Sequence, residues 1–456
     1  MEKTIAAVAT GNAAGGLGVI RINGDKAIEI ADKVFKPQDG SSLSDLKGYR
    51  AKFGSIVFEG ETFDDAVALI FRAPKSYTGE DVVELSVHGG LFIVERTLEA
   101  VFAAGAVPAE AGEFTKRAFL NGKMDLTQAE SVADLISAQG ETAAKASYNA
   151  LQGALSNKIN GVLESLTDCS ASMAAWVDYP DEEIPDLDDS ALADTLEKAK
   201  VALTELLKTY DNGQAMIQGV DTAIVGRPNA GKSTLMNLLS GREKSIVTTV
   251  EGTTRDVVED VVRLGELVLH LNDTAGLRES DDEVESIGIE RAYQKIESAM
   301  LVLPVFDSSR PLNAEDLELI DICKNKRTVA IINKTDLPTA AETDIPLITS
   351  TFDHCVFISA KNCRDTAELE RAIKEEIGAS DFDASAPMLA NQRQKLCCQR
   401  ALEDITEAAG CIDLGITRDA VNVLIDDAIN ELLSLTGKKA TVEVVNNIFS
   451  RFCVGK

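Results

Sequence analysis

The chain has 456 residues, of which 45% are hydrophobic and 26% are charged, a balance typical of soluble globular proteins. This length exceeds what one hydrophobic core usually serves, so we expect roughly two to four domains. The net charge of −29 keeps such a chain soluble but repels nucleic acid at long range, which argues against RNA binding through overall charge. Any contact with RNA would need a local basic patch or a partner protein.

Targeting and metal signals are weak in this sequence. No run approaches about 18 consecutive apolar residues, and the start, MEKTIAAVAT, has no basic flank before a long apolar core. We therefore expect neither a transmembrane helix nor a signal peptide. The eight cysteines include no CxxC pair and the three histidines lie far apart, which argues against a zinc site. Free thiols in a reducing cytoplasm are the simplest interpretation.

Residues 1–120 are predicted to form a compact α+β unit. Alternating or apolar runs typical of strands recur along this segment, and an apolar-periodic helix closed by Gly105 follows them. The strand-like runs are GVIRI, FGSIVFEG, AVALIFRA and VVELSVHGG, and the helical run is LFIVERTLEAVFAAGA.

From Asp125 the sequence becomes helical. The stretch DLTQAESVADLISA begins with an Asp N-cap and has a Gln three residues later, a capping-box pattern, and helical periodicity continues to about Tyr179. YPDEE interrupts the pattern, and a further helix is predicted over residues 189–210. After a polar linker at 381–387, the rest of the chain is helical again.

Between these helical stretches, from Gln218 to about Gly378, the pattern alternates strand, loop and helix, which predicts a mainly parallel sheet. Neither helical stretch would form a good core alone, so the simplest interpretation is one helical domain interrupted by an inserted α/β domain. The predicted fold is multidomain, α+β at the N-terminus and α/β in the insertion. The predicted domains are 1–120, 121–215, 216–380 and 381–456.

A phosphate-binding loop is predicted at residues 226–233, GRPNAGKS, which fit GxxxxGK[ST]. The loop follows a predicted strand and opens a helix, which is the structural context that this motif requires. Its glycines let backbone N–H groups point at phosphates, and the helix N-terminus adds positive potential. We expect Lys232 to reach the β- and γ-phosphates of a nucleotide and Ser233 to hold Mg²⁺.

Three further motifs predict that the nucleotide is GTP. Residues 273–276, DTAG, have the form of the second magnesium motif and switch. In NKTD at 333–336, the Asp336 carboxylate can accept hydrogen bonds from the N1–H and 2-amino groups of guanine, which adenine cannot offer. A site built on such an acceptor can discriminate by a factor on the order of 10⁴. Residues 359–361, SAK, follow another strand and supply a base-stacking loop.

The switch region lacks the glutamine that orients water in Ras-like enzymes, because Leu277 occupies that position. Another group must then supply polarity or positive charge. The candidates from the residues alone are Arg255, Arg278, Glu283 and Glu285. For Arg278 and Glu283, a role as solvated loop residues is an equally good interpretation.

Several stretches together resemble the MnmE (TrmE) family of tRNA-modification GTPases. In the G-domain region and at the chain's end these are GRPNAGKST, VEGTTRD, DTAGLRES, NKTD and FCVGK. In the first half they are SYTGEDVVELSVHGG, GEFTKRAFLNGKMDLTQAE and DYPDEEI. The resemblance covers nearly the whole chain, and it implies an N-terminal folate-binding and dimerising domain, a discontinuous helical domain and an inserted G domain.

The resemblance also implies a potassium-dependent GTPase that is activated when two G domains meet. A potassium ion would then do the electrostatic work of an arginine finger. The positions that match potassium ligands are Asn229, Thr248, Val250 and Thr253. Thr254 matches a magnesium ligand together with Ser233, and Glu285 matches the glutamate that positions water, with Arg255 as a second catalytic candidate. The GTP-binding set becomes Asn229, Ala230, Gly231, Lys232, Ser233, Thr234, Thr248, Thr249, Val250, Glu251, Gly252, Thr253, Thr254, Asp273, Thr274, Ala275, Gly276, Asn333, Lys334, Asp336, Ser359, Ala360 and Lys361.

For the folate site the matching residues are Arg21, Glu84, Lys123 and Lys456. A pterin shows the same N–H and NH₂ edge as guanine, so Glu84 could read it, and basic groups suit the glutamate tail. From the sequence alone, Arg21 and Glu84 are better explained as alternating charges on strand surfaces, so their role as ligands rests on the resemblance.

The implied reaction places an aminomethyl or carboxymethylaminomethyl group at C5 of the wobble uridine of certain tRNAs. It would use GTP, Mg²⁺, K⁺ and 5,10-methylenetetrahydrofolate, for which 5-formyltetrahydrofolate is an analogue. The implied partners are a second copy of the chain, a flavoprotein like MnmG (GidA) in a heterotetramer, and tRNA, with no membrane.

Two departures and two alternatives remain. The family usually has Asp-Ile-Ala where this chain has residues 249–251, TVE, and Pro304 falls in a strand-like run, where proline suits only an edge or a strand end.

A regulatory GTPase switch, for example in ribosome assembly, would need no folate pocket. A stand-alone folate enzyme is disfavoured because the chain has no flavin-binding GxGxxG fingerprint.

The chain ends in FCVGK, which places Cys453 where some GTPases carry a lipid. The tail fits a CaaX box badly, since Gly455 is not aliphatic and Lys456 is not a usual last residue. A structural, inert thiol is the ordinary alternative. The resemblance instead favours a tail folded back towards the folate site, with Cys453 as a catalytic candidate.

Overall fold

The computed structural model describes most of the chain. The described residues are 3–178, 189–240, 260–271, 296–339, 344–363, 366–380 and 382–456. They belong to two compact units. The first unit is Met1–Ala133, Ile159–Asp178 and Asn422–Lys456, and the second unit is Asp134–Lys158 and Tyr179–Val421. The domain boundaries inferred from the sequence stay a prediction. No helix in the described part is long and apolar enough to cross a bilayer.

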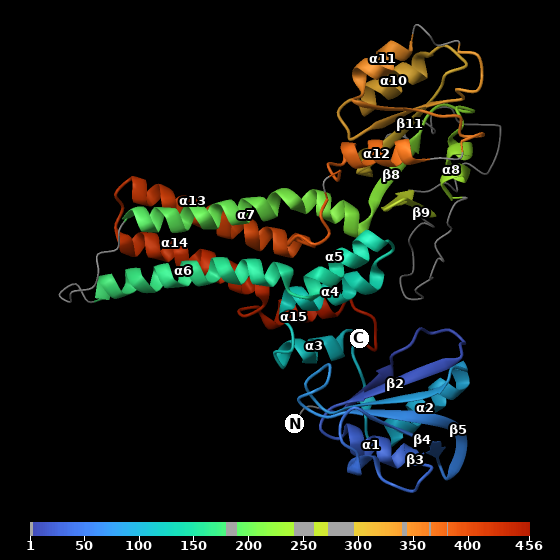
Figure 1. The fold of residues 1–456 in the computed structure, drawn as a ribbon, viewed down its shortest axis with the longest axis vertical. Helices are drawn as coiled ribbons and strands as arrows, with labels where there is room; N and C mark the ends of the chain where they lie inside the picture. Colours follow the sequence, from blue (N-terminus) through green and yellow to red (C-terminus); the bar gives the residue numbers. More distant parts are fainter. Residues whose placement is uncertain are drawn as a thin grey trace. The chain divides into compact units, whose positions relative to one another are not determined.

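The first unit contains a seven-stranded sheet in the order β3-β4-β5-β6-β2-β1-β7 (Figure 1). Neighbouring strands run antiparallel except β1 and β7. The strands are β1 (Ile5–Val8), β2 (Leu17–Asn23), β3 (Phe35–Pro37), β4 (Arg50–Phe58), β5 (Glu61–Phe71), β6 (Val82–His88) and β7 (Val107–Pro108). Helices α1 (Ala27–Val34) and α2 (Leu91–Ala103) pack on one face, and a short 3₁₀ turn lies at Leu43–Asp45.

Strand periodicity decides which side chains this sheet buries. Ile20 and Ile22 of β2 are fully buried in the core beneath α1 and α2, so Arg21 between them lies on the opposite face. Register places Arg21 directly opposite Glu84 of β6. The four predicted strand runs are confirmed, and helix α2 ends before Gly105, which has φ +119°.

Helices of the first unit follow the sheet in the chain. They are α3 (Glu113–Leu120), α15 (Val442–Phe449) and parts of α4 (Leu126–Ser137), α6 (Ala154–Asp178) and α14 (Arg418–Thr436). The predicted capping box is present at α4, where the N–H of Asp125 donates to Gln128 Oε1 and the N–H of Gln128 donates to Asp125 Oδ1. Phe449 of α15 packs with Phe452 and Leu126 in a small core.

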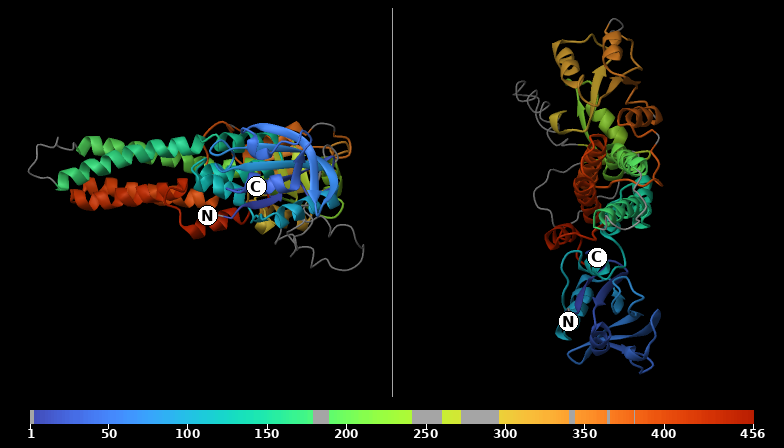
Figure 2. Two further views of the ribbon diagram at one scale, coloured as in Figure 1. Left: turned by 90° about the horizontal axis from the view of Figure 1, so that it is seen from below. Right: turned by 90° about the vertical axis from the view of Figure 1, so that its left-hand side faces the viewer.

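The second unit contains helices α5 (Glu141–Leu151), α7 (Asp189–Gln218) and α13 (Gln392–Asp413), of which α7 and α13 lie side by side (Figures 1 and 2). Helix α7 continues eight residues beyond the predicted end at Tyr210. Burial of Ala215 and Met216 against the second sheet accounts for this extension. Part of the predicted polar linker is also anchored, because Ala384 is buried and Phe382 packs beside it.

The second sheet has six strands in the order β13-β12-β11-β8-β10-β9. Its strands are β8 (Val220–Val225), β9 (Asp260–Leu264), β10 (Leu267–Leu271), β11 (Leu301–Asp307), β12 (Val329–Asn333) and β13 (His354–Phe357). Only β9 runs antiparallel to its neighbour, so the predicted mainly parallel sheet is confirmed. Helices α8 (Lys232–Ser240) and α12 (Ala367–Glu376) cover one face, and α10 (Ala314–Cys323) and α11 (Ile345–Thr351) cover the other.

Pro304 corrects one expectation from the sequence. It lies within β11, a central strand, rather than at an edge or a strand end. The N–H of Val302 donates to Arg327 on the β12 side, so the N–H that Pro304 lacks would face the same side. Registered pairing with β12 begins only at Val305. The sheet therefore tolerates this proline because it stands where β11 changes partners.

Candidate functional sites

The predicted phosphate loop connects β8 to α8 at the carboxyl edge of the second sheet. Its backbone needs small residues: Gly226 has φ +149° and Gly231 has φ +104°, and a Cβ on Gly231 would lie 2.1 Å from Asn333 Nδ2. Asn229 also adopts a left-handed conformation, with φ +62°, which asparagine tolerates better than most residues. The loop thus has the close turns that point backbone N–H groups at an anion.

Lys232 occupies the centre of this loop. Its ammonium group donates to the carbonyls of Gly226, at 2.6 Å, and Arg227, at 2.9 Å. Burial lowers the pKa of Lys232, and the nearby Glu315 opposes this shift in part. Ser233 and Thr234 follow in the first turn of α8, where the helix N-terminus favours negative charge. The arrangement can bind a phosphate group.

Asn333 joins the phosphate loop to the SAK loop. Its buried amide donates from Nδ2 to the Ala230 carbonyl at 2.9 Å, and its Oδ1 accepts the N–H of Ala360 at 2.9 Å. The next residue, Lys334, has φ +64° and donates to the Asn229 carbonyl at 2.8 Å. Asn333 and Lys334 therefore connect the NKTD motif to both the phosphate loop and the SAK loop.

Asp336 presents its carboxylate at the surface beside the SAK loop. Ser359 Oγ donates to its Oδ1 at 2.6 Å, and Asn362 Nδ2 donates to its Oδ2 at 3.2 Å. The Ser359 hydrogen bond, followed by weaker attraction to Lys361 and Lys334, lowers the pKa of Asp336. The group is an ionised acceptor, which is what recognition of a guanine N–H and NH₂ edge requires.

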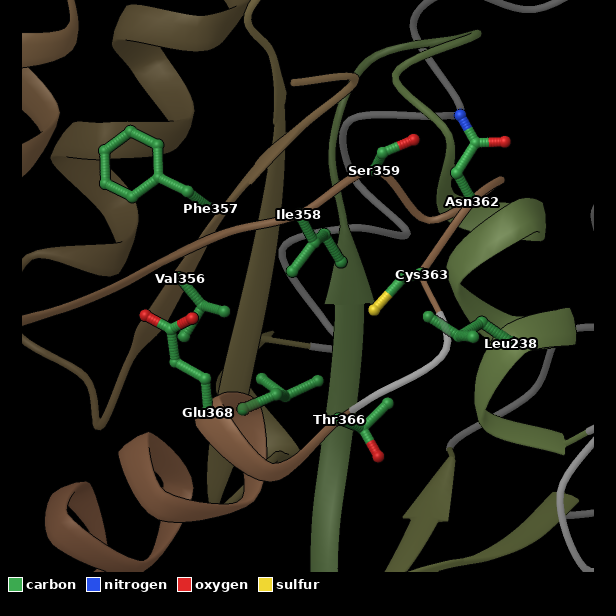
Figure 3. A pocket seen from close by; sticks show the side chains of 10 residues that line it. Leu238, Val356, Phe357, Ile358, Ser359, Asn362, Cys363, Thr366 and Glu368 are labelled. Atoms are coloured by element: carbon green, nitrogen blue, oxygen red, sulfur yellow. The ribbon is translucent and has the colours of Figure 1, made fainter. Parts of the chain in front are cut away.

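A pocket of about 220 Å³ lies next to this loop, between α8 and α12 (Figure 3). Leu238, Val356 and Ile358 supply apolar walls, and the Cys363 thiol points into the space. The pocket lies beside the two residues that donate hydrogen bonds to Asp336, since Ser359 and Asn362 belong to its lining.

Two functional residues were missed by reasoning from the sequence. Asp307 ends β11 and binds Lys334 Nζ at 2.6 Å. Burial acts to raise the pKa of Asp307, but the hydrogen bonds from Lys334 and Ser309 outweigh it and the pKa is lowered. The available signal was an aspartate closing an apolar strand at the carboxyl edge of a parallel sheet. Asn362 was also missed, and the short distance from SAK was the only clue to it.

Much of the predicted switch lies outside the described residues. The predicted site residues concerned are Thr248, Thr249, Val250, Glu251, Gly252, Thr253, Thr254, Arg255, Asp273, Thr274, Ala275, Gly276 and Glu285. Leu277, Arg278 and Glu283 lie outside them as well.

The second candidate site is in the first unit, on the face of the sheet that carries Arg21 and Glu84. Arg21 Nε and Nη2 each lie 2.8 Å from Glu84 Oε1, and both side chains are about one-fifth exposed. The guanidinium carbon also lies 5.5 Å from the centre of the Phe114 ring, within cation–π range. Arg21 Nη1 donates to the Gly455 carbonyl at 3.3 Å.

The last residues of the chain fold back onto this site. Val454 forms an antiparallel bridge with Ala111, and the N–H of Phe114 donates to the main-chain oxygen of Lys456 at 3.2 Å. Gly455 has φ +99°, and a Cβ there would lie 2.2 Å from the Val8 carbonyl oxygen. The Cys453 side chain is exposed. The tail is thus folded back as the resemblance implied.

Lys123 lies between α3 and α4. Its ammonium group donates to the Pro74 carbonyl at 3.1 Å. Pro74 and Tyr77 lie on the loop between β5 and β6, and the Tyr77 hydroxyl lies 2.9 Å from Thr115 Oγ1. Burial raises the pKa of Tyr77, while the positive charge of Arg21 acts to lower it. Tyr77 and Phe114 therefore belong to the surroundings of Arg21; both lie in stretches that carry the resemblance, but neither was predicted as a site residue.

Comparison with known proteins covers both sites. A family model described as the GTP-binding protein TrmE N-terminus matches residues 4–123, and one described as the MnmE helical domain matches residues 126–453. The tRNA modification GTPase MnmE of Acetivibrio thermocellus is 37% identical over 460 residues, which cover 100% of this chain and 99% of that protein. The MnmE of Clostridioides difficile is 36% identical, covering 100% of both chains. That of Streptococcus mutans is 38% identical, covering 99% of this chain and 98% of that protein.

Proposed function

Because the chain belongs to the MnmE family of tRNA modification GTPases, we propose that it is a potassium-activated GTPase that modifies C5 of the wobble uridine with a tetrahydrofolate one-carbon unit. A flavoprotein partner would take part in the same reaction. One observation supports the proposal: the second unit presents the exposed Asp336 carboxylate beside the SAK loop, while the first unit holds an arginine–glutamate pair against the folded-back tail. A pure switch needs only the first of these.

In this proposal the phosphate loop holds GTP. Lys232 would leave the two loop carbonyls for the β- and γ-phosphates, and Ser233, at the start of α8, would bind Mg²⁺ together with Thr254. The glycine turns and the loop's left-handed Asn229 fit such a group. Mg²⁺ would neutralise the charge that develops on the phosphates. Asp336 would read guanine, and the SAK loop would cover the base.

Potassium activation is proposed from Asn229 together with Thr248, Val250 and Thr253. Of these four, Asn229 lies in the described part of the chain, and Lys334 fixes its carbonyl. Glu285 and Arg255 are proposed to act on the attacking water and the phosphate charge. The test is GTP turnover at equal ionic strength in potassium and in sodium. Turnover should be at least tenfold faster in potassium if the ion acts as an arginine finger does, and equal rates would remove the cation from the mechanism.

A folate pocket is proposed around Arg21, Glu84, Lys123 and Lys456. Glu84 would accept the pterin N–H and NH₂ groups, and the basic residues would bind the glutamate tail, with Cys453 close to the transferred carbon. Support comes from the Arg21–Glu84 pair and from the Arg21 bond to the Gly455 carbonyl. The exposed thiol and the half-buried Lys456 are consistent with such a pocket.

Calorimetry with 5-formyltetrahydrofolate tests this pocket. The wild-type chain should give saturable heat, and Glu84→Gln should remove it, because an amide opposes the pterin NH₂ with its own N–H donors. Glu61→Gln is the matched control. Glu61 lies on β5, next to the strand that carries Glu84, and forms an exposed ion pair with Arg96 of α2. A flat wild-type titration would refute the folate site and favour the regulatory switch.

The proposed assembly is a homodimer that joins a flavoprotein like MnmG and acts on tRNA in the cytoplasm. The flavin must come from a partner because the sequence has no GxGxxG fingerprint for it. Nucleoside analysis of tRNA from cells lacking this chain separates the two candidate functions. Loss of the modified wobble uridine supports the enzyme, and an unchanged nucleoside profile supports a switch.

A further inference from the structure

The outer side of the phosphate loop faces two buried carboxylates that belong to none of the nucleotide motifs. Asp307 is the last residue of β11 and is 3% exposed, and Asp316 lies in the first turn of α10 and is 1% exposed. They lie on either side of the segment that links β11 to α10. Buried carboxylates are costly unless they are paired, so their partners indicate what they do.

Asp316 holds the beginning of the phosphate loop. Its Oδ2 lies 3.1 Å from Nη1 of Arg227, the residue directly after Gly226. The same oxygen accepts the N–H of Asn313 at 3.1 Å, and Asn313 Oδ1 accepts the N–H of Asp316 at 3.0 Å. This reciprocal capping box fixes the carboxylate at the start of α10. The Arg227 side chain is therefore tied to a rigid helix end.

Asp307 holds the middle of the loop through one intermediate residue. Its Oδ2 accepts from Lys334 Nζ at 2.6 Å, and the same ammonium group donates to the Asn229 carbonyl at 2.8 Å. The N–H and Oγ of Ser309 donate to Oδ1 at 3.0 and 2.6 Å, which fixes the carboxylate. The left-handed turn at Asn229 is thus held from the end of β11.

We propose that Asp316 and Asp307 are positioning residues that clamp the phosphate loop from outside, one at Arg227 and the other, through Lys334, at Asn229. The clamp rests on the proposed role of residues 226–233 in holding nucleotide phosphates. It keeps the loop amides aimed at the phosphates, and a displacement of about 1 Å in such a site is enough to weaken binding strongly. The loop is then aligned by the β11–α10 segment as well as by its own glycines.

Affinity for a fluorescent GDP tests the clamp at Arg227 on the full-length chain. Asp316→Asn and Arg227→Gln should each raise the dissociation constant at least about tenfold, because each leaves a buried charge without its partner. The double variant should bind about as weakly as the weaker single variant, since both remove one shared interaction. Dissociation constants within about twofold of wild type, or single effects that multiply in the double variant, would overturn the clamp.

Folding and stability are separated from positioning by two further measurements. Melting temperatures are recorded for every variant, because a purely structural ion pair would lower them and leave GDP affinity unchanged. Arg227→Lys should recover binding to within about threefold of wild type, because the contact uses a single guanidinium nitrogen.

Loss of the contact from Asp307 through Lys334 to Asn229 should weaken GDP binding less than loss of the contact at Arg227. Asp307→Asn should raise the dissociation constant about threefold to tenfold, because the Lys334 side chain is 26% exposed and water can solvate its charge in part. An unchanged constant would remove Asp307 from the clamp.

Two controls complete the experiment. Asp321→Asn removes an exposed partner of Lys324 on the same helix and should leave GDP binding unchanged. Lys232→Ala tests the proposed phosphate loop itself. If Lys232→Ala binds GDP like wild type, the phosphate-loop proposal fails. If it loses GDP while the clamp variants bind normally, only the clamp fails.

Discussion

The two candidate sites are built in opposite ways. The nucleotide site of the second unit uses short motifs that the parallel sheet brings to one edge, where Asn333 joins the phosphate loop to the SAK loop. The site of the first unit joins Arg21 to Gly455, 434 positions apart in the sequence. The first kind of site can be found from local spacing, while the second exists only once the chain has folded.

Their electrostatics differ as well. Asp336 is an exposed carboxylate whose hydrogen bonds come from Ser359 and Asn362 at the SAK loop, so it can accept a ligand's N–H groups without losing a partner. Glu84 is already paired with Arg21, and both are mostly buried. A ligand at Glu84 must compete with that pair or share it. We therefore expect nucleotide binding to depend on single residues, and binding in the first unit to depend on the whole arrangement.

The largest expected effect is at Asp336, where one residue should decide the base. Asp336→Asn should weaken GTP binding by a factor on the order of 10⁴, because the amide cannot accept from both guanine donors. Xanthosine triphosphate, which has a carbonyl in place of the 2-amino group, should bind this variant better than GTP does. Competition against fluorescent GDP or XDP measures both constants. Unchanged GTP affinity would contradict guanine reading by this residue.

The next largest expected effect is that of Gly455→Ala, which displaces the C-terminal tail. Gly455→Ala places a Cβ 2.2 Å from the Val8 oxygen, at φ +99°, so the tail must move and Arg21 loses its bond to the Gly455 carbonyl. We expect affinity for 5-formyltetrahydrofolate to fall at least about tenfold, as expected when a site loses its alignment. Calorimetry gives the constant.

Gly40→Ala is the matched control for that variant. Gly40 also has a left-handed conformation, with φ +70°, but a Cβ there meets nothing within 4 Å. It therefore carries the same kind of backbone strain without displacing the tail, and folate affinity should stay at the wild-type value. Equal losses in Gly40→Ala and Gly455→Ala would mean that general destabilisation, rather than tail position, controls binding.

These differences explain what could be predicted from the sequence. The glycine turns of the phosphate loop, the capping box at Asp125 and the mainly parallel sheet follow from local patterns, and the structure contains them. The end of α7 was placed too early because Ala215 and Met216 are buried by tertiary packing that periodicity does not record. Pro304 was assigned to an edge or a strand end because its change of partners within a central strand is invisible in one segment.

The first unit shows the same limit at a functional site. Arg21 and Glu84 look like alternating surface charges on two strands, and only the register places them opposite each other. Tyr77 and Phe114 near them come from a loop and a helix start that no motif connects to the tail. Asp307 was missed for a related reason, since its partner Lys334 belongs to a different strand end.

A smaller effect is expected at Ser359, which supports Asp336 without replacing it. Ser359→Ala removes the hydrogen bond that contributes most to lowering the pKa of Asp336, so that pKa should rise. GTP affinity should fall about threefold to tenfold, as for one hydrogen bond to a charged group. Thr349→Ala, which removes a hydroxyl bonded only within α11, is the control. An effect as large as that of Asp336→Asn would mean that the loop, rather than the carboxylate, carries recognition.

The smallest expected effect is a pH-dependent change in melting temperature that arises from His88 in the first unit. His88 of β6 pairs with Asp64, and this hydrogen bond raises the pKa of His88. A raised histidine pKa stabilises the fold below the unfolded value of about 6.5, and that stabilisation is lost as pH rises through the folded value. The melting temperature of His88→Gln should therefore fall below that of wild type at about pH 5.5 and match it at about pH 8.5. Arg96→Gln, which removes an ion pair that contains no histidine, should show the same difference at both values. The lowered pKa values of Asp336 and Asp307 keep these two carboxylates ionised in this range, and the ratio of GDP affinity between His88→Gln and wild type should be the same at both pH values. A parallel change in GDP affinity would mean that the two sites are coupled.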